Sequence, residues 1–166
     1  MIRWRSLLVA SIGALGLVGW GSASVGADQG HSILEFESMT PVTGAAVGTV
    51  NDRGIKGGGL PWAITAGSGE VDRDGHVEVT VKGLVIPVAP FNGTNPVPMF
   101  GATVSCITRN GIVNNVRTAT VPANAAGDAS IDTTVSLPRG CRDPILFVTS
   151  PGGAWFAMSN AEDDEE

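Results

Sequence analysis

Few side chains in this 166-residue sequence have the types and spacing that catalysis requires. Ser68 is the one serine flanked by two glycines, but Ala66 stands where the nucleophile elbow of a hydrolase has its glycine. The sequence contains two histidines, His31 and His76, and His76 is expected on the polar face of a hairpin. A nucleophile, a base and an orienting group cannot be assembled from these residues, so the sequence does not indicate a serine hydrolase.

Acidic residues offer a second kind of chemistry, the binding of a cation. Asp72-Arg73-Asp74-Gly75 is similar to the opening of a calcium-binding loop, but the twelfth position of that motif, which is acidic, is Gly83 in this chain. The same residues are typical of a tight turn, where Asp and Gly supply local hydrogen bonds and a positive φ. We therefore predict a hairpin turn and keep a weak cation site near Asp72 and Asp74 as the alternative.

Aromatic side chains are the candidates for a binding surface, because tryptophan and phenylalanine exposed on a sheet or loop can contact a glycan or a protein. Trp62 and Phe91 stand next to two long, poorly patterned segments. Trp155 and Phe156 are adjacent in an expected strand, so one should face the core and the other solvent, a loop or a partner. The predicted binding rim comprises Trp62, Phe91 and Trp155.

The two cysteines, Cys106 and Cys141, are predicted to form one disulfide. Cys106 falls on the inward face of an expected strand, and Cys141 follows the end of another. A thiol that binds a metal would need a histidine at ligand spacing, and none is present. On the chain-entropy model, a bridge that closes 35 positions stabilises the fold by about 3–4 kcal/mol.

Residue usage and periodicity predict strands rather than helices. From Asp28 onward the chain contains 16 valines and 13 threonines but 5 leucines, and no stretch keeps a 3.6-residue apolar period. Val77, Val79 and Val81 alternate with polar residues, as one face of a half-buried strand does. Strands are expected over residues 76–82, 100–106 and 129–137, with weaker ones over 33–39, 60–66, 112–120, 145–149 and 153–158.

Turn residues separate these strands at short intervals, which is typical of an antiparallel sandwich. Asn110-Gly111 between apolar runs indicates a tight hairpin. Residues 40–59, rich in glycine, are expected to form a long loop in which Gly57-Gly58-Gly59 is a flexible linker. Residues 86–98 contain four prolines and are expected to form an extended surface loop. The predicted fold is an all-β, antiparallel β-sandwich of immunoglobulin-like architecture, with a small β-barrel as the alternative.

The N-terminal segment has the three-part layout of a secretory signal peptide. Two arginines precede an apolar run of 14 residues, from Leu7 to Trp20, and small residues then lead to Ala27. The run is shorter than the ~20 residues that span a bilayer. We therefore expect residues 1–27 to be a signal peptide cleaved after Ala27, with cleavage after Ser24 as second choice.

Cleavage would leave one domain, residues 28–160, followed by an acidic tail, residues 161–166, that is expected to be solvated and disordered. The 139 residues from Asp28 onward carry 8 basic and 16 acidic side chains, a net charge of −8. Such a surface repels nucleic acid and anionic lipid, so neither is an expected partner.

Three motifs carry a resemblance to small secreted bacterial proteins. They are Gly69-Glu70-Val71 with Gly75-His76-Val77, Pro87-Val88-Ala89-Pro90-Phe91-Asn92-Gly93-Thr94, and Pro151-Gly152-Gly153-Ala154-Trp155-Phe156-Ala157. On these motifs the stretch from Phe36 to Ser159 resembles small exported β-sandwich-like proteins of actinobacteria. The resemblance implies export and a disulfide. It implies no activity, so it assigns a catalytic role to no residue.

The sequence therefore predicts a secreted, non-enzymatic β-sandwich that acts by contact with a protein or a glycan at the cell envelope. No cofactor is expected, and neither is insertion into a membrane after the signal peptide is removed. The alternative is an extracellular enzyme or a metal-binding protein whose carboxylates, among them Asp72, Asp74 and Glu78, come together only in the fold.

Overall fold

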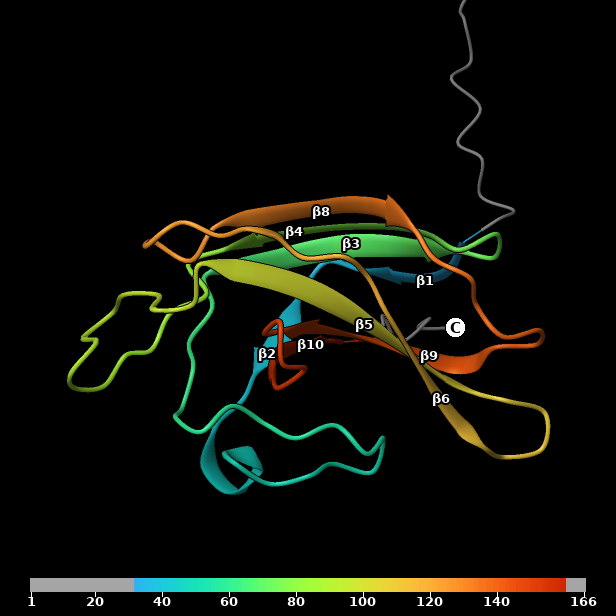
Figure 1. The fold of residues 1–166 in the computed structure, drawn as a ribbon, viewed down its shortest axis with the longest axis horizontal. Coiled ribbons are helices and arrows are strands. Elements are labelled where there is room, and N and C mark those ends of the chain that lie inside the picture. Colours follow the sequence, from blue (N-terminus) through green and yellow to red (C-terminus); the bar gives the residue numbers. More distant parts are fainter. Residues whose placement is uncertain (1–31, 161–166) are drawn as a thin grey trace, which may run out of the picture.

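The chain forms an all-β fold in which two antiparallel sheets pack face to face (Figure 1). The computed structural model describes residues 32–160, so the expected signal peptide, His31 and the acidic tail lie outside the described residues. The four-stranded sheet contains, in spatial order, β1 (Ser32–Phe36), β3 (Ala66–Asp72), β4 (His76–Lys82) and β8 (Ala129–Thr134). The six-stranded sheet contains β2 (Met39–Pro41), β10 (Trp155–Ser159), β9 (Arg142–Thr149), β5 (Met99–Ile107) and β6 (Val113–Arg117), with β7 (Val121–Pro122) also paired to β5.

This architecture confirms the predicted antiparallel β-sandwich. Over residues 32–160 the two sheets remain separate layers and do not close into a barrel. The one helical element among these residues is η1 (Gly44–Ala46), a single 3₁₀ turn. Both predicted tight turns are present: Asp72–Gly75 joins β3 to β4, and Asn110-Gly111 lies in the hairpin between β5 and β6. In each turn the glycine has a positive φ, +95° at Gly75 and +75° at Gly111, which a side chain would disfavour.

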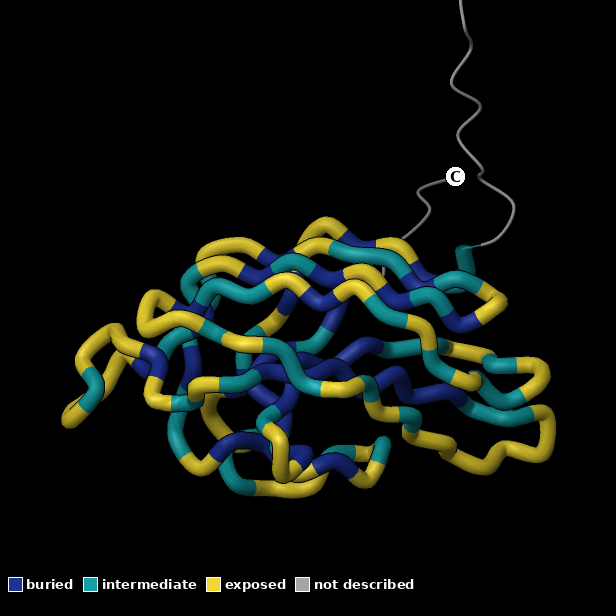
Figure 2. The backbone as a smooth tube through the Cα atoms, turned by 45° about the horizontal axis from the view of Figure 1, so that its top comes forward, coloured by how far each residue is buried: buried dark blue, intermediate teal, exposed yellow. Residues whose placement is uncertain are grey.

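The four-stranded sheet has one buried and one solvated face, as the alternation of its residues predicts. Val77, Val79 and Val81 are at most 1% exposed, and Ile131 of the neighbouring β8 lies with them in the core. The polar residues between these valines point away from the core. The outer face of this sheet is therefore open to solvent (Figure 2).

The six-stranded sheet is buried on both faces at its centre, which the alternation of apolar and polar residues along β5 does not predict. Along β5, Ala102 and Val104 face the other sheet, and Thr103 and Ser105 point to the opposite side, yet all four are at most 1% exposed. Residues 42–62 form an additional layer, which packs on the face of the six-stranded sheet that points away from the four-stranded sheet (Figure 1). The expected long loop is thus a packed cover rather than a free connection.

Glycines bring this cover close to the sheet. The Gly58 amide donates to the Trp155 carbonyl, and the Trp155 amide donates to the Lys56 carbonyl, each over 2.9 Å. A Cβ on Gly57 would collide with the backbone oxygen of Ala46, and one on Gly58 would collide with the indole of Trp62. The prediction that Gly57-Gly58-Gly59 is a flexible linker is therefore wrong, because Gly57 and Gly58 are buried and permit close packing.

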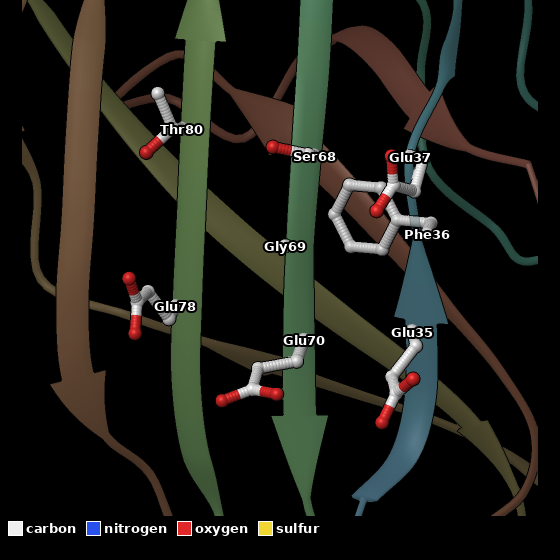
Figure 3. Close-up of a pocket in the computed structure, with 8 residues that line it drawn as sticks. All are labelled: Glu35, Phe36, Glu37, Ser68, Gly69, Glu70, Glu78 and Thr80. Carbon is white, nitrogen blue, oxygen red and sulfur yellow. The ribbon is translucent and has the colours of Figure 1, made fainter. Parts of the chain in front are cut away.

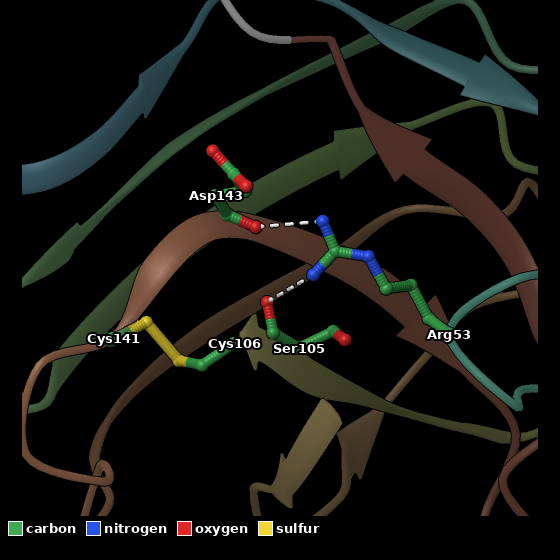
Figure 4. The surroundings of a disulfide bond; sticks show 5 residues. All are labelled: Arg53, Ser105, Cys106, Cys141 and Asp143. Atoms are coloured by element: carbon green, nitrogen blue, oxygen red, sulfur yellow. Dashed lines mark hydrogen bonds between the residues drawn. A yellow bond between two sulfur atoms is a disulfide. The ribbon is translucent and has the colours of Figure 1, made fainter. Parts of the chain in front are cut away.

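Arg53 fastens the cover to the two central strands. Its guanidinium donates to the backbone oxygen of Ser105 on β5 over 3.4 Å and to that of Asp143 on β9 over 2.9 Å (Figure 4). Close by, Cys106 and Cys141 form the predicted disulfide, with their Cα atoms 4.9 Å apart. The bridge therefore joins β5 to the segment that enters β9, at the place where Arg53 reaches the same strands.

Two of the expected strands, over residues 60–66 and 33–39, are not formed as single strands. Residues 60–65 form no strand, because they carry the chain from the cover to the four-stranded sheet and pair only through a bridge between Ala63 and Val85. The expected strand over 33–39 is divided into β1 and β2, which belong to different sheets. The proline-rich segment 86–98 is a loop as predicted, closed by a bridge between Ile86 and Thr94.

Removing the disulfide tests how much the bridge contributes to stability. We expect the double variant Cys106→Ala/Cys141→Ala to lose about 3–4 kcal/mol in the free energy of unfolding, because the unfolded chain is no longer constrained. Urea denaturation of the variant and of the oxidised wild type measures this difference. Two free thiols in the unfolded, unreduced wild-type protein would contradict the bridge.

Candidate functional site

A row of carboxylates crosses the outer face of the four-stranded sheet, with one acid from each strand. Glu35 on β1 is the cross-strand partner of Glu70 on β3, and Glu70 is the partner of Glu78 on β4. Glu78 in turn faces Asp132 on β8. Like charges directly opposite each other on neighbouring strands lower the stability of a sheet. This row is therefore a feature that folding alone does not favour.

Part of the row forms a shallow pocket of about 320 Å³ (Figure 3). The polar side chains that line it come from three adjacent strands and the residue after β1; they are Glu35, Glu37, Ser68, Glu70, Glu78 and Thr80. No basic side chain lines this pocket. Its chemistry is therefore that of a cation-attracting surface rather than an anion site.

His76 stands at one end of the acidic face and contacts two carboxylates. Its Nε2 lies 3.0 Å from Asp132 Oδ1, and its Nδ1 lies 3.6 Å from Asp72 Oδ2. The hydrogen bond with the Asp132 carboxylate raises the pKa of His76 above its ordinary value, although desolvation opposes the shift; the negative charges of Asp132 and Asp72 add to the increase. The imidazolium form is therefore favoured by this surface.

Glu70, Asp72 and His76 bring one potential ligand atom each within 4.8 Å of one another. When Nε2 of His76 donates to Asp132, the lone pair of Nδ1 is left on the side of Asp72. Metal-binding histidines commonly use this arrangement, in which a carboxylate on the second ring nitrogen fixes the tautomer and the ring orientation. These three residues can therefore supply two carboxylate oxygens and one imidazole nitrogen to a divalent cation.

The acids that the sequence singled out are brought together only in part. Asp72 and Glu78 lie on the acidic face, whereas Asp74 stays in the turn, where its carboxylate is 3.4 Å from the His76 amide nitrogen. The sequence interpretation did not include Glu70 and Asp132 among the candidate site residues. The Asp72–Gly75 turn sets the register that places Glu70 opposite Glu78, so Glu70 could have been inferred from the sequence.

The predicted binding rim is not formed as proposed. Trp62 and Trp155 are 3% and 4% exposed, so the prediction that they present a binding surface is wrong. Trp62 stacks on Phe156 with ring centroids 4.0 Å apart, inside the sandwich, and Trp155 packs edge-on against Phe147 beneath the cover, at 5.7 Å. Both faces of β10 are covered, so adjacent aromatic residues are both buried.

Phe91, the third rim residue, is half-buried and packs against the core from the proline-rich loop. Ser68, the one serine between glycines, lies on β3 opposite Thr80. His76 is four residues further along β4 from Thr80, so it does not stand beside the Ser68 hydroxyl. The structure therefore assembles no serine–histidine pair within the described residues.

Charge is divided between the two layers of the molecule. The four-stranded sheet and its turn carry, besides the acidic row, the carboxylates of Glu37, Asp72 and Asp74, against the two basic side chains Arg73 and Lys82. The six-stranded sheet, its hairpin and its cover carry five basic side chains, Arg53, Lys56, Arg109, Arg117 and Arg142, against the two acidic side chains Asp52 and Asp143. Opposite sides of one small domain therefore attract partners of opposite charge.

Comparison with known protein families, with curated proteins and with solved structures found no match for the chain. No helix in the described part of the chain is long and apolar enough to cross a membrane.

The histidine titration tests this electrostatic description. We expect Asp132→Asn to lower the pKa of His76, because the variant removes the main hydrogen bond to the charged ring. NMR of the His76 ring protons as a function of pH measures this pKa. The raised pKa means that protonated His76 stabilises the fold below about pH 6.5, and this contribution is lost as the pH rises through the folded-state value. The stability difference between wild type and Asp132→Asn should therefore be larger at about pH 5 than at about pH 9. An unchanged His76 pKa would contradict the assignment.

Proposed function

We propose that the protein is a secreted, non-enzymatic binding protein that uses the acidic face of its four-stranded sheet to bind a positively charged partner outside the cell. The row of Glu35, Glu70, Glu78 and Asp132 carries this proposal. Four carboxylates in one line across a sheet cost stability and would be dispersed if the face served only to remain solvated. A cationic surface laid over them removes that repulsion.

The exposure of the row suits binding better than catalysis. Glu35, Glu78 and Asp132 are exposed, and the side chain of Asp132 keeps 74% of its accessible surface. Catalytic carboxylates are usually buried enough for their pKa values to be shifted, and they converge on one reacting atom. Here the acids point outward from the sheet into solvent, where they speed the approach of a cationic partner over a distance of one Debye length, ~8–10 Å.

Secretion is supported by two independent features. The N-terminal residues have the layout of a signal peptide, and the disulfide between Cys106 and Cys141 is of a kind that persists in oxidising compartments. In this proposal the bridged sandwich is a rigid scaffold, and the acidic face is its working surface.

A pair of charge-matched variants tests the binding proposal with fluorescein-labelled octalysine as the probe. We expect Glu70→Gln/Glu78→Gln to weaken binding about tenfold at low salt, because it removes the two central charges of the row. The control, Asp52→Asn/Asp143→Asn, removes the same net charge from the other layer and should change the affinity little. Fluorescence anisotropy measures both.

The same variants separate electrostatics from misfolding. Glu70→Gln/Glu78→Gln should raise the midpoint of thermal unfolding, because each like-charge pair costs roughly 0.2–1 kcal/mol. Equal weakening by the two double variants would show that octalysine responds only to net charge, and the proposed face would then be rejected.

A second candidate function is the binding of a divalent metal ion by Glu70, Asp72 and His76. The specific observation that favours it is the hydrogen bond of Asp132 to the second ring nitrogen of His76. A ligand set of one imidazole and two carboxylates suits Zn²⁺. The site lies on the acidic face, so a bound Zn²⁺ would reduce the negative charge available to a cationic partner.

Zinc titration tests the metal site directly. We expect Zn²⁺ to shift the His76 ring resonances and EDTA to reverse the shift, and we expect Asp132→Asn to weaken binding about tenfold, as loss of an orienting partner typically does. Asp74→Asn is the matched control, since Asp74 belongs to the turn and not to the ligand set. If Asp74→Asn weakens Zn²⁺ binding as much as Asp132→Asn does, the ion is attracted by the net negative charge of the surface, and the proposed ligand set is rejected.

A further inference from the structure

A second cavity, of about 290 Å³, lies on the opposite side of the molecule, between the six-stranded sheet and its cover. Three parts of the chain meet there: the cover, the paired strands β5 and β6, and the turn that joins β9 to β10. The lining residues are Gly54, Ile55, Lys56, Thr103, Asn115, Arg117 and Gly152–Ala154. Its size is near the lower end for small-molecule sites.

The charge of this cavity is positive. Lys56 and Arg117 line it, and no acidic side chain does. Within residues 32–160 neither cation forms an ion pair with a carboxylate. In a protein with an excess of acids, two cations that share a cavity without an acid between them create a local attraction for an anion.

A buried hydroxyl at the same cavity lacks a hydrogen-bond partner. Thr103 is 1% exposed, and its Oγ1 is among the few buried polar atoms of the described chain that neither donate nor accept a hydrogen bond. An unpaired buried hydroxyl typically costs ~1–3 kcal/mol, which valine at the same position would avoid. Thr103 is the cross-strand partner of Arg117, so the hydroxyl-bearing residue and the guanidinium-bearing residue stand side by side.

The neighbouring groups restrict how Arg117 and Asn115 lie. A Cβ on Gly153 would collide with the guanidinium of Arg117, so glycine at this position lets the arginine pack against the turn backbone. The side-chain amide of Asn115 donates to the Arg53 carbonyl over 2.8 Å, which fixes its orientation and leaves its oxygen as an acceptor. The cavity thus combines two cationic donors, one hydroxyl and one amide oxygen.

We propose that this cavity binds a hydroxylated carboxylate of about the size of a monosaccharide, an acidic sugar being the simplest example. The guanidinium of Arg117 matches the two oxygens of a carboxylate, and Lys56 adds a point charge. One hydroxyl group of the ligand supplies the hydrogen-bond partner that Thr103 Oγ1 lacks. Another hydroxyl group donates a hydrogen bond to the side-chain oxygen of Asn115. The site is independent of the acidic face and does not rest on the function proposed for it.

The test is an NMR titration of the ¹⁵N-labelled protein with D-glucuronate, in parallel with D-glucose and sodium sulfate. We expect glucuronate to shift the backbone amide resonances of Gly152, Gly153 and Ala154, which line the cavity. Glucose, which has the hydroxyls without the charge, should cause no shift, and sulfate should bind at least about tenfold more weakly because it lacks the hydroxyls. No shift with glucuronate, or equal binding of sulfate or glucose, would overturn the proposal.

Variants link the binding to individual groups. Arg117→Gln should weaken glucuronate binding about tenfold or more, since it removes a charge-assisted hydrogen bond. Arg73→Gln, which removes the same charge from the exposed turn between β3 and β4, is the matched control and should have no effect. If Arg73→Gln weakens binding as much as Arg117→Gln, the anion is attracted by net charge and not by this cavity.

Thr103→Val distinguishes a binding role from a structural one. It should weaken glucuronate binding about threefold to tenfold, while the thermal midpoint of the free protein stays the same or rises, because an unpaired hydroxyl is replaced by a methyl group. A fall in the thermal midpoint without a change in affinity would assign Thr103 to packing alone and overturn its place in the site.

Discussion

Residues 101–104 of β5 and 146–149 of β9 are buried on both faces of the sheet, and this constraint determines how the rest of the chain is used. One face of each strand packs in the sandwich, so the other needs a cover, which residues 42–62 provide. Covering a sheet with irregular backbone requires close approach and fixed attachment points. Gly57 and Gly58 allow the approach, and Arg53 and Trp155 provide the attachment. The tryptophans are therefore structural residues.

The outer faces of the two sheets consequently differ, because one is open to solvent and the other is covered by residues 42–62. The four-stranded sheet buries one face only, so its outer side is free to carry side chains chosen for their charge, and the Glu70–Glu78 pair is part of that surface. The six-stranded sheet meets solvent through its cover and its edges, where Lys56 and Arg117 lie. A cover of irregular chain cannot fill every space above a pleated sheet. The cavity beside Thr103 is a space of this kind.

Much of the fold follows from local sequence patterns, because alternation and turn chemistry act over few residues. Val77, Val79 and Val81 predicted a buried face, and Asp72–Gly75 predicted the hairpin that aligns Glu70 with Glu78. The positions of Glu35 and Asp132 beside them could not be predicted, since β1 and β8 pair with strands far away in the sequence. The cover was equally hidden, because polar Thr103 and Ser105 gave strand β5 the pattern of a solvated face.

The separation of charge between the layers gives the molecule a permanent dipole moment directed across its thickness. A body with such a dipole does not tumble freely near a charged boundary, because one orientation lowers its electrostatic energy and the reverse orientation raises it. Beside an anionic polymer, the side that carries Arg109, Arg117 and Arg142 turns inward, and the carboxylates of β3 and β4 face the medium. Ionic strength sets the distance over which this alignment operates, so dilution extends it and salt abolishes it.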